Sequence, residues 1–311
     1  MTDSLLIEAL GLSHHYGQLA AVREVNLTLR RGEVLGLLGP NGAGKSTTMN
    51  MLCGVLAPTA GMIRINGIDL LDEPRRAKQH IGYLPERPPV YRDMTVDEYL
   101  AYTARLHGLK RAGVSRALHN AKQRCGLEQA GRRLIGNLSK GYQQRVGIAQ
   151  AILHEPAVVI LDEPTVGLDP IQIHEIRDLI RDLGSKHSVL LSTHILPEVQ
   201  AVCDRVQIIH QGQTVFDESL DTLARRESDR LLVGFAHPPA MEALKGVAGV
   251  SDVEALSEGR FRIRHAAATD TAAELARRSA EHDWGLRELT PERAGLEQIF
   301  MDLVYREAEA A

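Results

Sequence analysis

Short apolar runs alternate with longer helix-like segments from Leu5 to about Phe216. The runs include VLGLLG, AVVILDEP, SVLLST and RVQII. A continuous apolar run bounded by turn residues is typical of a strand buried on both faces, and such strands alternating with helices form parallel sheets. We therefore predict an α/β domain in which a parallel sheet lies between layers of helices.

The strand-like runs stop between Met94 and Ala151. Two segments of this region, TVDEYLAYTARLHGL and GYQQRVGIAQAIL, are amphipathic at helical spacing. We predict that a helical subdomain, at about residues 94–151, is inserted in the sheet domain.

The pattern changes again after Gly212. Six segments read as strand, helix, strand, strand, helix and strand: RLLVGFA, PAMEALKGV, VSDVEAL, GRFRIRH, TAAELARRSAEH and WGLRELT. This order is that of a ferredoxin-like unit. A closing helix, RAGLEQIFMDLVYREAEA, follows, and the charged stretch DTLARRESDR near residue 225 is the linker candidate. We predict one domain at residues 1–220 and a small α+β domain at residues 221–311.

Composition restricts the possible partners. The 311 residues are 44% hydrophobic and carry a formal net charge of -4, so no excess of basic residues indicates nucleic acid as a direct partner. Cys53, Cys125 and Cys203 are widely spaced, which favours neither a disulfide framework nor a zinc site and fits a reducing compartment. The start, MTDSLLIEAL, lacks the features of a signal peptide, and no apolar run is as long as about 18 residues. We expect a soluble chain that reaches a membrane only through a partner.

The segment GPNGAGKSTT matches the phosphate-loop pattern through Gly39, Gly44, Lys45 and Ser46, after a predicted strand and before a predicted helix. Glycines let backbone N–H groups turn toward phosphate oxygens, and the helix N-terminus adds its positive dipole end. Lys45 would reach the β and γ phosphates, and the Ser46 hydroxyl would bind Mg²⁺. The loop residues expected to contact nucleotide are Asn41, Gly42, Ala43, Gly44, Lys45, Ser46 and Thr47.

The run AVVILDEP supplies the second part of a nucleotide site. A buried strand would present Asp162 at its carboxyl end, suited to hold Mg²⁺ through water, followed by Glu163, positioned to polarise an attacking water. An acidic pair after a strand is also typical of a solvated turn. Its combination with the phosphate loop favours the catalytic interpretation.

With these motifs in place, the chain resembles the ATP-binding subunit of an ABC transporter over about residues 5–216. In NLSKGYQQRVGIAQAI, Ser139 and Gly141 stand where the family contacts the γ-phosphate from the opposite subunit. Asp169 in GLDP resembles the D-loop, and His194 in LLSTHIL the switch histidine. Tyr16 in HHYG stands where an aromatic ring stacks on adenine.

Each of these positions also has a simpler interpretation. Tyr16 could be a packing residue, and His194 alone would be a polar residue at a strand end. Ser139 could be a helix N-cap, a role compatible with phosphate contact at the same helix end. His14 and His15 have no comparable support and are left out of the site.

Two departures from the family pattern matter. The signature usually reads Leu-Ser-Gly-Gly-Gln, whereas Lys140 and Tyr142 here replace the first Gly and the Gln. Lys140 adds a positive charge that could favour ATP, and Tyr142 puts the contact of the glutamine in doubt. Glu86 in IGYLPERPPVY replaces the usual Gln. We hypothesise that Glu86 still offers an oxygen to Mg²⁺, although it adds negative charge beside Asp162 and Glu163.

The resemblance is to stand-alone ATPases of type-2 ABC permeases, of the drug-export, gliding-motility and nitrous-oxide-reductase maturation types. It rests on IGYLPE, MTVDEYL, LSKGY, PTVGLDP and a terminal LEQIF. It implies an ATPase that closes as a head-to-tail homodimer on two ATP molecules. This dimer would drive a separate integral membrane permease in the direction of export, and it would lie at the cytoplasmic face of the cell membrane. Glu163 and His194 would be catalytic, and Ser46, Glu86 and Asp162 would hold Mg²⁺.

Other functions stay open. One alternative is an ABC ATPase that acts on a nucleic-acid or ribosomal partner without a permease, and another is a module that binds ATP without turning it over. The C-terminal region, with Trp284 in its strand pattern, shows no catalytic constellation and reads as an interaction or regulatory domain, with a small-ligand sensor as the alternative. His237, His265 and His282 are too scattered to indicate metal sensing.

Overall fold

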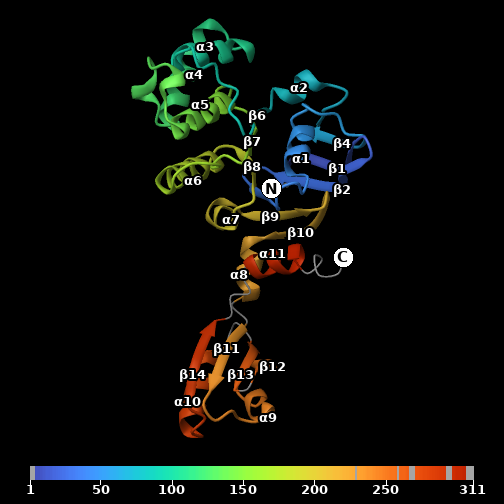
Figure 1. Cartoon of the computed structure of the whole chain (residues 1–311), viewed down its shortest axis with the longest axis vertical. Helices are drawn as coiled ribbons and strands as arrows, with labels where there is room; N and C mark the ends of the chain where they lie inside the picture. Colours follow the sequence, from blue (N-terminus) through green and yellow to red (C-terminus); the bar gives the residue numbers. More distant parts are fainter. Residues whose placement is uncertain (1–3, 228–229, 258, 266–269, 292–295, 306–311) are drawn as a thin grey trace. The chain divides into compact units, whose positions relative to one another are not determined.

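The computed structural model describes residues 4–227, 230–257, 259–265, 270–291 and 296–305. The chain divides into two compact units, Met1–Glu218 and Ser219–Ala311. Figure 1 labels the helices and strands of each unit, and the units are described separately.

The first unit is built on a six-stranded sheet with the strand order β10-β9-β3-β8-β7-β6. Five of its strands, β9, β3, β8, β7 and β6, are parallel neighbours. This confirms the parallel α/β core predicted from the apolar runs. The strands are β3 (Val34–Leu38), β6 (Ile81–Leu84), β7 (Val158–Asp162), β8 (Ser188–Thr193), β9 (Arg205–His210) and β10 (Gln213–Ser219).

A second, antiparallel sheet of the first unit was not predicted. Its strand order is β2-β1-β4-β5. The central pair is long but interrupted by several register shifts, so side chains do not alternate cleanly between buried and exposed. Residues of this sheet, the parallel sheet and helix α1 share one apolar core. The strands are β1 (Leu5–Tyr16), β2 (Leu19–Arg30), β4 (Ala60–Ile65) and β5 (Ile68–Asp69).

Helices cover the parallel sheet, and three of them, with two short 3₁₀ turns, occupy the region predicted to be a helical subdomain. In Figure 1 these three, α3, α4 and α5, gather at one corner of the first unit, away from β1, β2 and β4. The helices of the first unit are α1 (Lys45–Leu52), α2 (Pro74–Lys78), α3 (Val96–Leu106), α4 (Arg111–Arg124), α5 (Lys140–Ile152), α6 (Pro170–Gly184) and α7 (Leu196–Val202). The 3₁₀ turns are η1 (Glu128–Ala130) and η2 (Ile135–Asn137).

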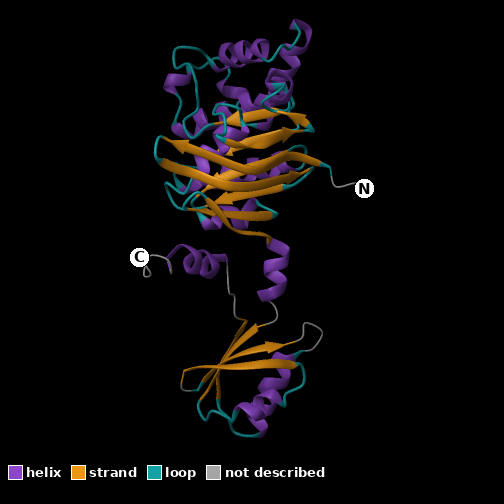
Figure 2. Cartoon of the chain, turned by 90° about the vertical axis from the view of Figure 1, so that its right-hand side faces the viewer, coloured by secondary structure: helices purple, strands orange, loops and turns teal. Residues whose placement is uncertain are grey.

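The second unit contains an antiparallel sheet with the strand order β12-β13-β11-β14. This is the split β-α-β order predicted from the sequence, and Figure 2 shows its strands and helices by colour. Its core includes Phe235, against which Trp284 packs edge-on at 5.7 Å between ring centroids. The elements are β11 (Arg230–Phe235), α9 (Met241–Lys245), β12 (Val250–Ser257), β13 (Arg260–His265), α10 (Thr271–Glu281) and β14 (Leu286–Pro291).

Two further helices flank this sheet in sequence. The stretch predicted as a linker forms most of helix α8 (Leu220–Glu227), and its residues 228–229 lie outside the described part. The closing helix is α11 (Leu296–Tyr305), and the remaining residues of that predicted segment lie outside the described residues.

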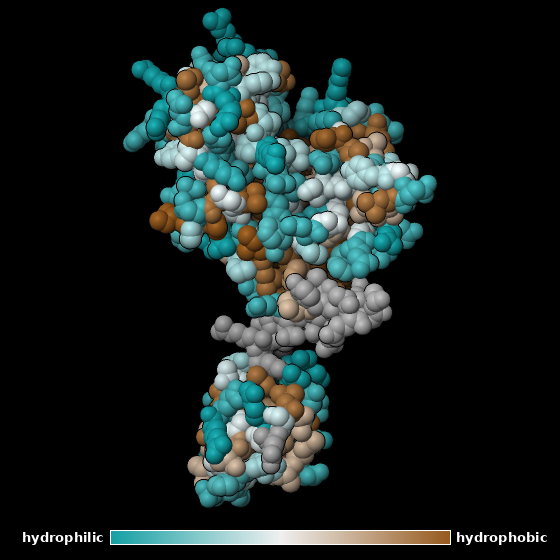
Figure 3. All heavy atoms as spheres, in the orientation of Figure 1, coloured by the Kyte–Doolittle hydropathy of each residue, from teal (hydrophilic) through white to brown (hydrophobic). Residues whose placement is uncertain are grey.

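The described residues contain no helix that is both long and apolar enough to cross a membrane. Hydrophobic side chains on the visible face of the first unit are scattered rather than gathered in a band (Figure 3). The three cysteines are buried and unpaired.

Candidate active site

The phosphate loop connects β3 to α1, as predicted. A side chain at Gly39 would collide with the carbonyl oxygen of Ile209. Gly44 has φ +105°, and a Cβ there would lie 2.7 Å from the carbonyl oxygen of Ala21. Both glycines of the motif are therefore required by close backbone approach, and Gly44 also by its left-handed conformation.

Lys45 is buried at the start of α1 and lies at the centre of the loop. Its Nζ donates to the carbonyl oxygens of Gly39 at 2.8 Å and Pro40 at 3.2 Å. The same ammonium is 3.4 Å from Oε1 of Glu163. A cation held by the loop in this way is aimed at the space that phosphate oxygens would enter.

Asp162 ends β7 and is 2% exposed. Its Oδ1 accepts hydrogen bonds from the hydroxyls of Ser192 and Ser46, the latter at 3.4 Å. Burial raises the pKa of Asp162, the two hydroxyls lower it in part, and the negative charges of Glu163 and Glu86 raise it further. This end of the sheet therefore carries more negative charge than its own hydrogen bonds compensate.

Glu163 follows β7 with φ +47°, in the left-handed region. Its backbone N–H donates to the backbone oxygen and the hydroxyl of Ser192, each at 3.2 Å. Its carboxylate is buried, with Oε2 2.9 Å from Nδ1 of His194. The structure thus brings together Lys45, Glu163 and His194, which are separated in sequence but were all predicted to belong to the site.

A buried carboxylate that sequence reasoning missed ties the segments after β7 and β8 together. Glu198, on α7, is 1% exposed. Its two oxygens accept hydrogen bonds from the hydroxyl of Thr165 and, at 2.7 Å, from that of Thr193. Thr165 lies two residues beyond Glu163, and Thr193 precedes His194. An acidic residue four positions after the predicted histidine was the only available sequence signal.

Lys45, Glu163 and His194 border a cavity of about 380 Å³, which Asp162 and Glu198 do not line. Two of its residues, Ala21 and Val166, were not predicted. Ala43, also predicted, is buried within the loop. The predicted residues that line it are Asn41, Gly42, Gly44, Lys45, Ser46, Thr47, Glu86, Glu163 and His194.

Besides the buried Ala43 and Asp162, four predicted residues do not line this cavity. Ser139 is the N-cap of α5, where its hydroxyl accepts from the N–H of Tyr142 at 3.4 Å, so the predicted capping role is confirmed. Asp169 caps α6 in the same way, accepting from Gln172 N at 2.9 Å. Gly141 lies against Gln172, since a Cβ at Gly141 would be 2.8 Å from its Cδ.

Tyr16, the fourth, is 51% exposed at the end of β1. Its only described ring contact is an edge-on one with His14 at 4.6 Å between centroids. A packing role is therefore weak for Tyr16, because about half of its surface is accessible to another group.

No group of three or more His, Cys, Asp or Glu side chains suited to hold a metal occurs among the described residues. The oxygen atoms of Ser46, Asp162 and Glu86 are nevertheless the hard donors that Mg²⁺ prefers, and Mg²⁺ commonly binds through one or two carboxylates and substrate phosphates. These residues therefore fit a magnesium ion completed by a nucleotide.

The chain is similar in sequence to curated proteins. Residues 22–166 match the family described as ABC transporter. The ABC transporter ATP-binding protein NatA of Bacillus subtilis (strain 168) is 40% identical over 209 residues, which are 67% of this chain and 85% of NatA. The linearmycin resistance ATP-binding protein LnrL of the same strain is 30% identical over 308 residues, which are 97% of this chain and 99% of LnrL.

Solved structures share the architecture of the first unit. The ATP-binding subunit of an ABC transporter, 37% identical, superposes with a TM-score of 0.64 over 71% of this chain and 92% of its own. A bacterial ABC transporter cassette solved as a dimer, 26% identical, gives a TM-score of 0.62 over 69% of this chain and 98% of its own.

Proposed function

The chain belongs to the ABC transporter family of ATP-binding subunits. From this premise we propose that two copies of the chain hydrolyse ATP at shared sites. The energy of hydrolysis would drive a separate membrane permease in the direction of export. ATP binding and hydrolysis are properties of the family. The shared site, the ion, the permease and the direction are our proposal.

One observation carries the catalytic assignment: the buried Glu163 carboxylate lies between Lys45 at 3.4 Å and His194 at 2.9 Å, at the border of the phosphate-loop cavity. When ATP enters, its γ-phosphate offers Lys45 a stronger anionic partner than Glu163. Glu163 can then accept the proton of the attacking water, while His194 holds the carboxylate and the γ-phosphate in line. Lys45 and the loop N–H groups stabilise the charge that develops on the phosphate oxygens.

Ser46, Asp162 and Glu86 would hold the magnesium ion. Such an ion would supply positive charge to the phosphate oxygens. Burial first, and then the charges of Glu163 and Glu86, raise the pKa of Asp162, and a cation here would offset both effects. Glu86 in place of the usual glutamine fits this role, because it lines the same cavity.

Two copies are required because one chain presents only half of the predicted contacts. Ser139, Gly141 and Asp169 do not border the cavity that contains Lys45. If they contact nucleotide, as the family signature implies, the nucleotide is held by the phosphate loop of another copy. A related bacterial cassette that was solved as a dimer supports assembly of two copies.

An exposed aromatic pair supports a permease contact near the loop after Glu86. Tyr91, half exposed, and Tyr102 lie 5.9 Å apart between ring centroids. Exposed aromatic clusters favour protein contacts, and Tyr91 lies five residues after Glu86 in the chain. The export direction is supported by the relative named for linearmycin resistance. The subunit would then lie at the cytoplasmic face of the membrane.

The Glu163→Gln variant tests the shared site. It keeps the shape of the side chain but removes the general base, so ATP should bind without being hydrolysed. With ATP and Mg²⁺ we expect light scattering after gel filtration to give the mass of a dimer, and without ATP the mass of a monomer. A monomer under both conditions, with ATP bound, would refute the two-copy proposal.

A further inference from the structure

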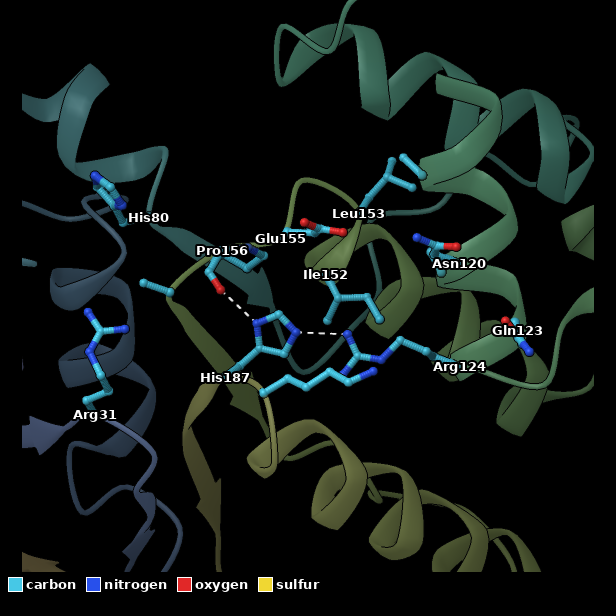
Figure 4. A pocket seen from close by; sticks show the side chains of 14 residues that line it. Arg31, His80, Asn120, Gln123, Arg124, Ile152, Leu153, Glu155, Pro156 and His187 are labelled. Carbon is cyan, nitrogen blue, oxygen red and sulfur yellow. Dashed lines mark hydrogen bonds between the residues drawn. The ribbon is translucent and has the colours of Figure 1, made fainter. Parts of the chain in front are cut away.

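A second cavity, of about 670 Å³, lies in the first unit, remote from the phosphate loop. It is bordered by the residues just before β7 and β8, including Ala157 and His187, whereas Asp162 is the last residue of β7 and His194 follows β8. Because β7 and β8 are parallel, these two sets of residues lie at opposite ends of the strands. Figure 4 shows Arg31 and His80 on one side of the cavity and Asn120 and Gln123 of α4 on the other. No residue of this cavity has a role in the ATPase mechanism.

The cavity combines an apolar floor with a basic wall. Ile152 and Leu153, at the end of α5, are buried and border it. Its fixed charges are Arg31, Arg124 and Lys186, against the single carboxylate of Glu155. Arg31 and Lys186 are exposed. A concave site with an apolar floor and few polar groups is typical of small-molecule sites, and the excess of cations favours an anion.

A hydrogen bond between Arg124 and His187 holds the Arg124 guanidinium in place. A carbonyl oxygen only accepts, so the 2.7 Å bond between His187 Nδ1 and Pro156 O places the ring hydrogen on Nδ1. Nε2 of His187 therefore accepts from Arg124 Nη1 at 2.9 Å, as drawn in Figure 4. Burial, with smaller contributions from neighbouring charges including Arg124, lowers the pKa of His187 and keeps the ring neutral.

The other edge of the Arg124 guanidinium is not hydrogen-bonded. Nε and Nη2 are buried without a hydrogen-bond partner, and Oδ2 of the exposed Asp182 lies 3.6 Å from Nε. Because these two nitrogens are enclosed by the protein, Arg124 contributes to the cavity through its charge and not through a direct contact with a ligand. The Arg124 side chain is only 16% exposed and borders the cavity, and its charge is shared between the cavity and the exposed Asp182 carboxylate.

We propose that this cavity binds a small organic phosphate monoester. The apolar body of the ligand would lie on Ile152 and Leu153. Its phosphate would face Lys186, with Arg31 on one side of the cavity and the buried charge of Arg124 on the other. The volume suits a molecule of this class. Because α4 and the beginnings of β7 and β8 all border the cavity, the ligand would bridge the helical region and the parallel sheet.

Phenyl phosphate is the probe that tests this site. The full chain, labelled at isoleucine and leucine methyl groups and saturated with ADP and Mg²⁺ to fill the phosphate loop, is titrated and followed by NMR. We expect saturable shifts of the Ile152 and Leu153 signals with phenyl phosphate and much weaker shifts with phenol or phenyltrimethylammonium. Absence of saturable shifts, or equal shifts with phenol, would overturn the proposal.

Two charge-reversal variants, one at a residue that lines the cavity and one outside it, supply the matched comparison. Lys186→Glu is expected to weaken phenyl phosphate binding by about tenfold or more, because an attraction becomes a repulsion. Arg75→Glu makes the same charge change on the exposed helix α2, outside the cavity, and should leave binding unchanged. Equal binding by the two variants would contradict a phosphate site at Lys186.

Discussion

At the scale of single residues, the chemistry of the site was readable from sequence but its geometry was not. Lys45 and Glu163 were predicted as partners of one nucleotide because their motifs follow two buried strands. The positive φ of Glu163 was not predictable, since it accompanies hydrogen bonds to Ser192, 29 residues further along the chain. Local sequence does not encode such contacts, and strain of this kind gathers at functional sites.

Asp162→Asn should stabilise the folded chain while impairing its function. The pKa of Asp162 is raised, so the folded chain binds more protons than the unfolded chain between the ordinary and the raised pKa. The free energy of unfolding therefore falls as pH rises through that window and is recovered at lower pH. An uncharged asparagine removes this loss, so we expect the Tm at neutral pH to rise by a few degrees and its dependence on pH to weaken.

The same variant should lose ATPase activity by at least about tenfold, since a ligand of the ion is changed. Thermal unfolding followed by circular dichroism from acid to neutral pH checks the predicted change in Tm. Steady-state ATPase assays check the predicted loss of activity. Asp72→Asn is a suitable control, because it neutralises an exposed carboxylate that does not line the cavity. A lower Tm for Asp162→Asn than for the wild type would contradict the electrostatic account of this position.

At the scale of elements, the clearest signals came from strands buried on both faces. β3, β7 and β8 are wholly buried, so their sequences are continuous apolar runs. β1 and β2 escaped prediction because β1 has polar and half-buried positions, and register shifts break the alternation that a one-sided sheet would show. Helix α5 was predicted together with its cap, since Ser139 precedes an amphipathic run.

Glu198 should hold the ends of two strands in register for catalysis. In Glu198→Ala the hydroxyls of Thr165 and Thr193 lose their buried acceptors, so we expect a loss of about 1–3 kcal/mol in the free energy of unfolding. Because the segments that carry Glu163 and His194 are released, kcat should fall more than the affinity for ATP. Glu198→Gln keeps one acceptor and should recover part of both losses; equal kcat in all three proteins would exclude the positioning role.

Ser139 allows capping to be separated from phosphate contact. Ser139→Ala should cost about 1 kcal/mol of stability, whereas Ser139→Asp supplies another good N-cap and should restore it. The aspartate would nevertheless repel the γ-phosphate of the opposite copy, so ATPase activity should stay low in both variants. Chemical denaturation and ATPase assays decide: full activity of Ser139→Asp would mean that Ser139 serves only as a cap.

At the scale of the whole molecule, the two units have separate cores. The core of the second unit contains only residues from Leu231 onward, and every residue of the phosphate-loop cavity lies before position 195. A chain of residues 1–220 should therefore fold, and bind ATP within about twofold of the full chain, because distant sites contribute independently. Calorimetric titration with ATP checks this, and an unfolded or non-binding fragment would contradict the proposed domain division.

The central claim is that one active site is made by two copies, and mixing two inactive variants tests it most directly. Lys45→Ala disables the phosphate loop, and Ser139→Asp disables the signature. A head-to-tail dimer of one copy of each retains one intact site, so an equal mixture should recover about a quarter of wild-type ATPase activity after random pairing. A mixture no more active than its separate components would contradict the shared site.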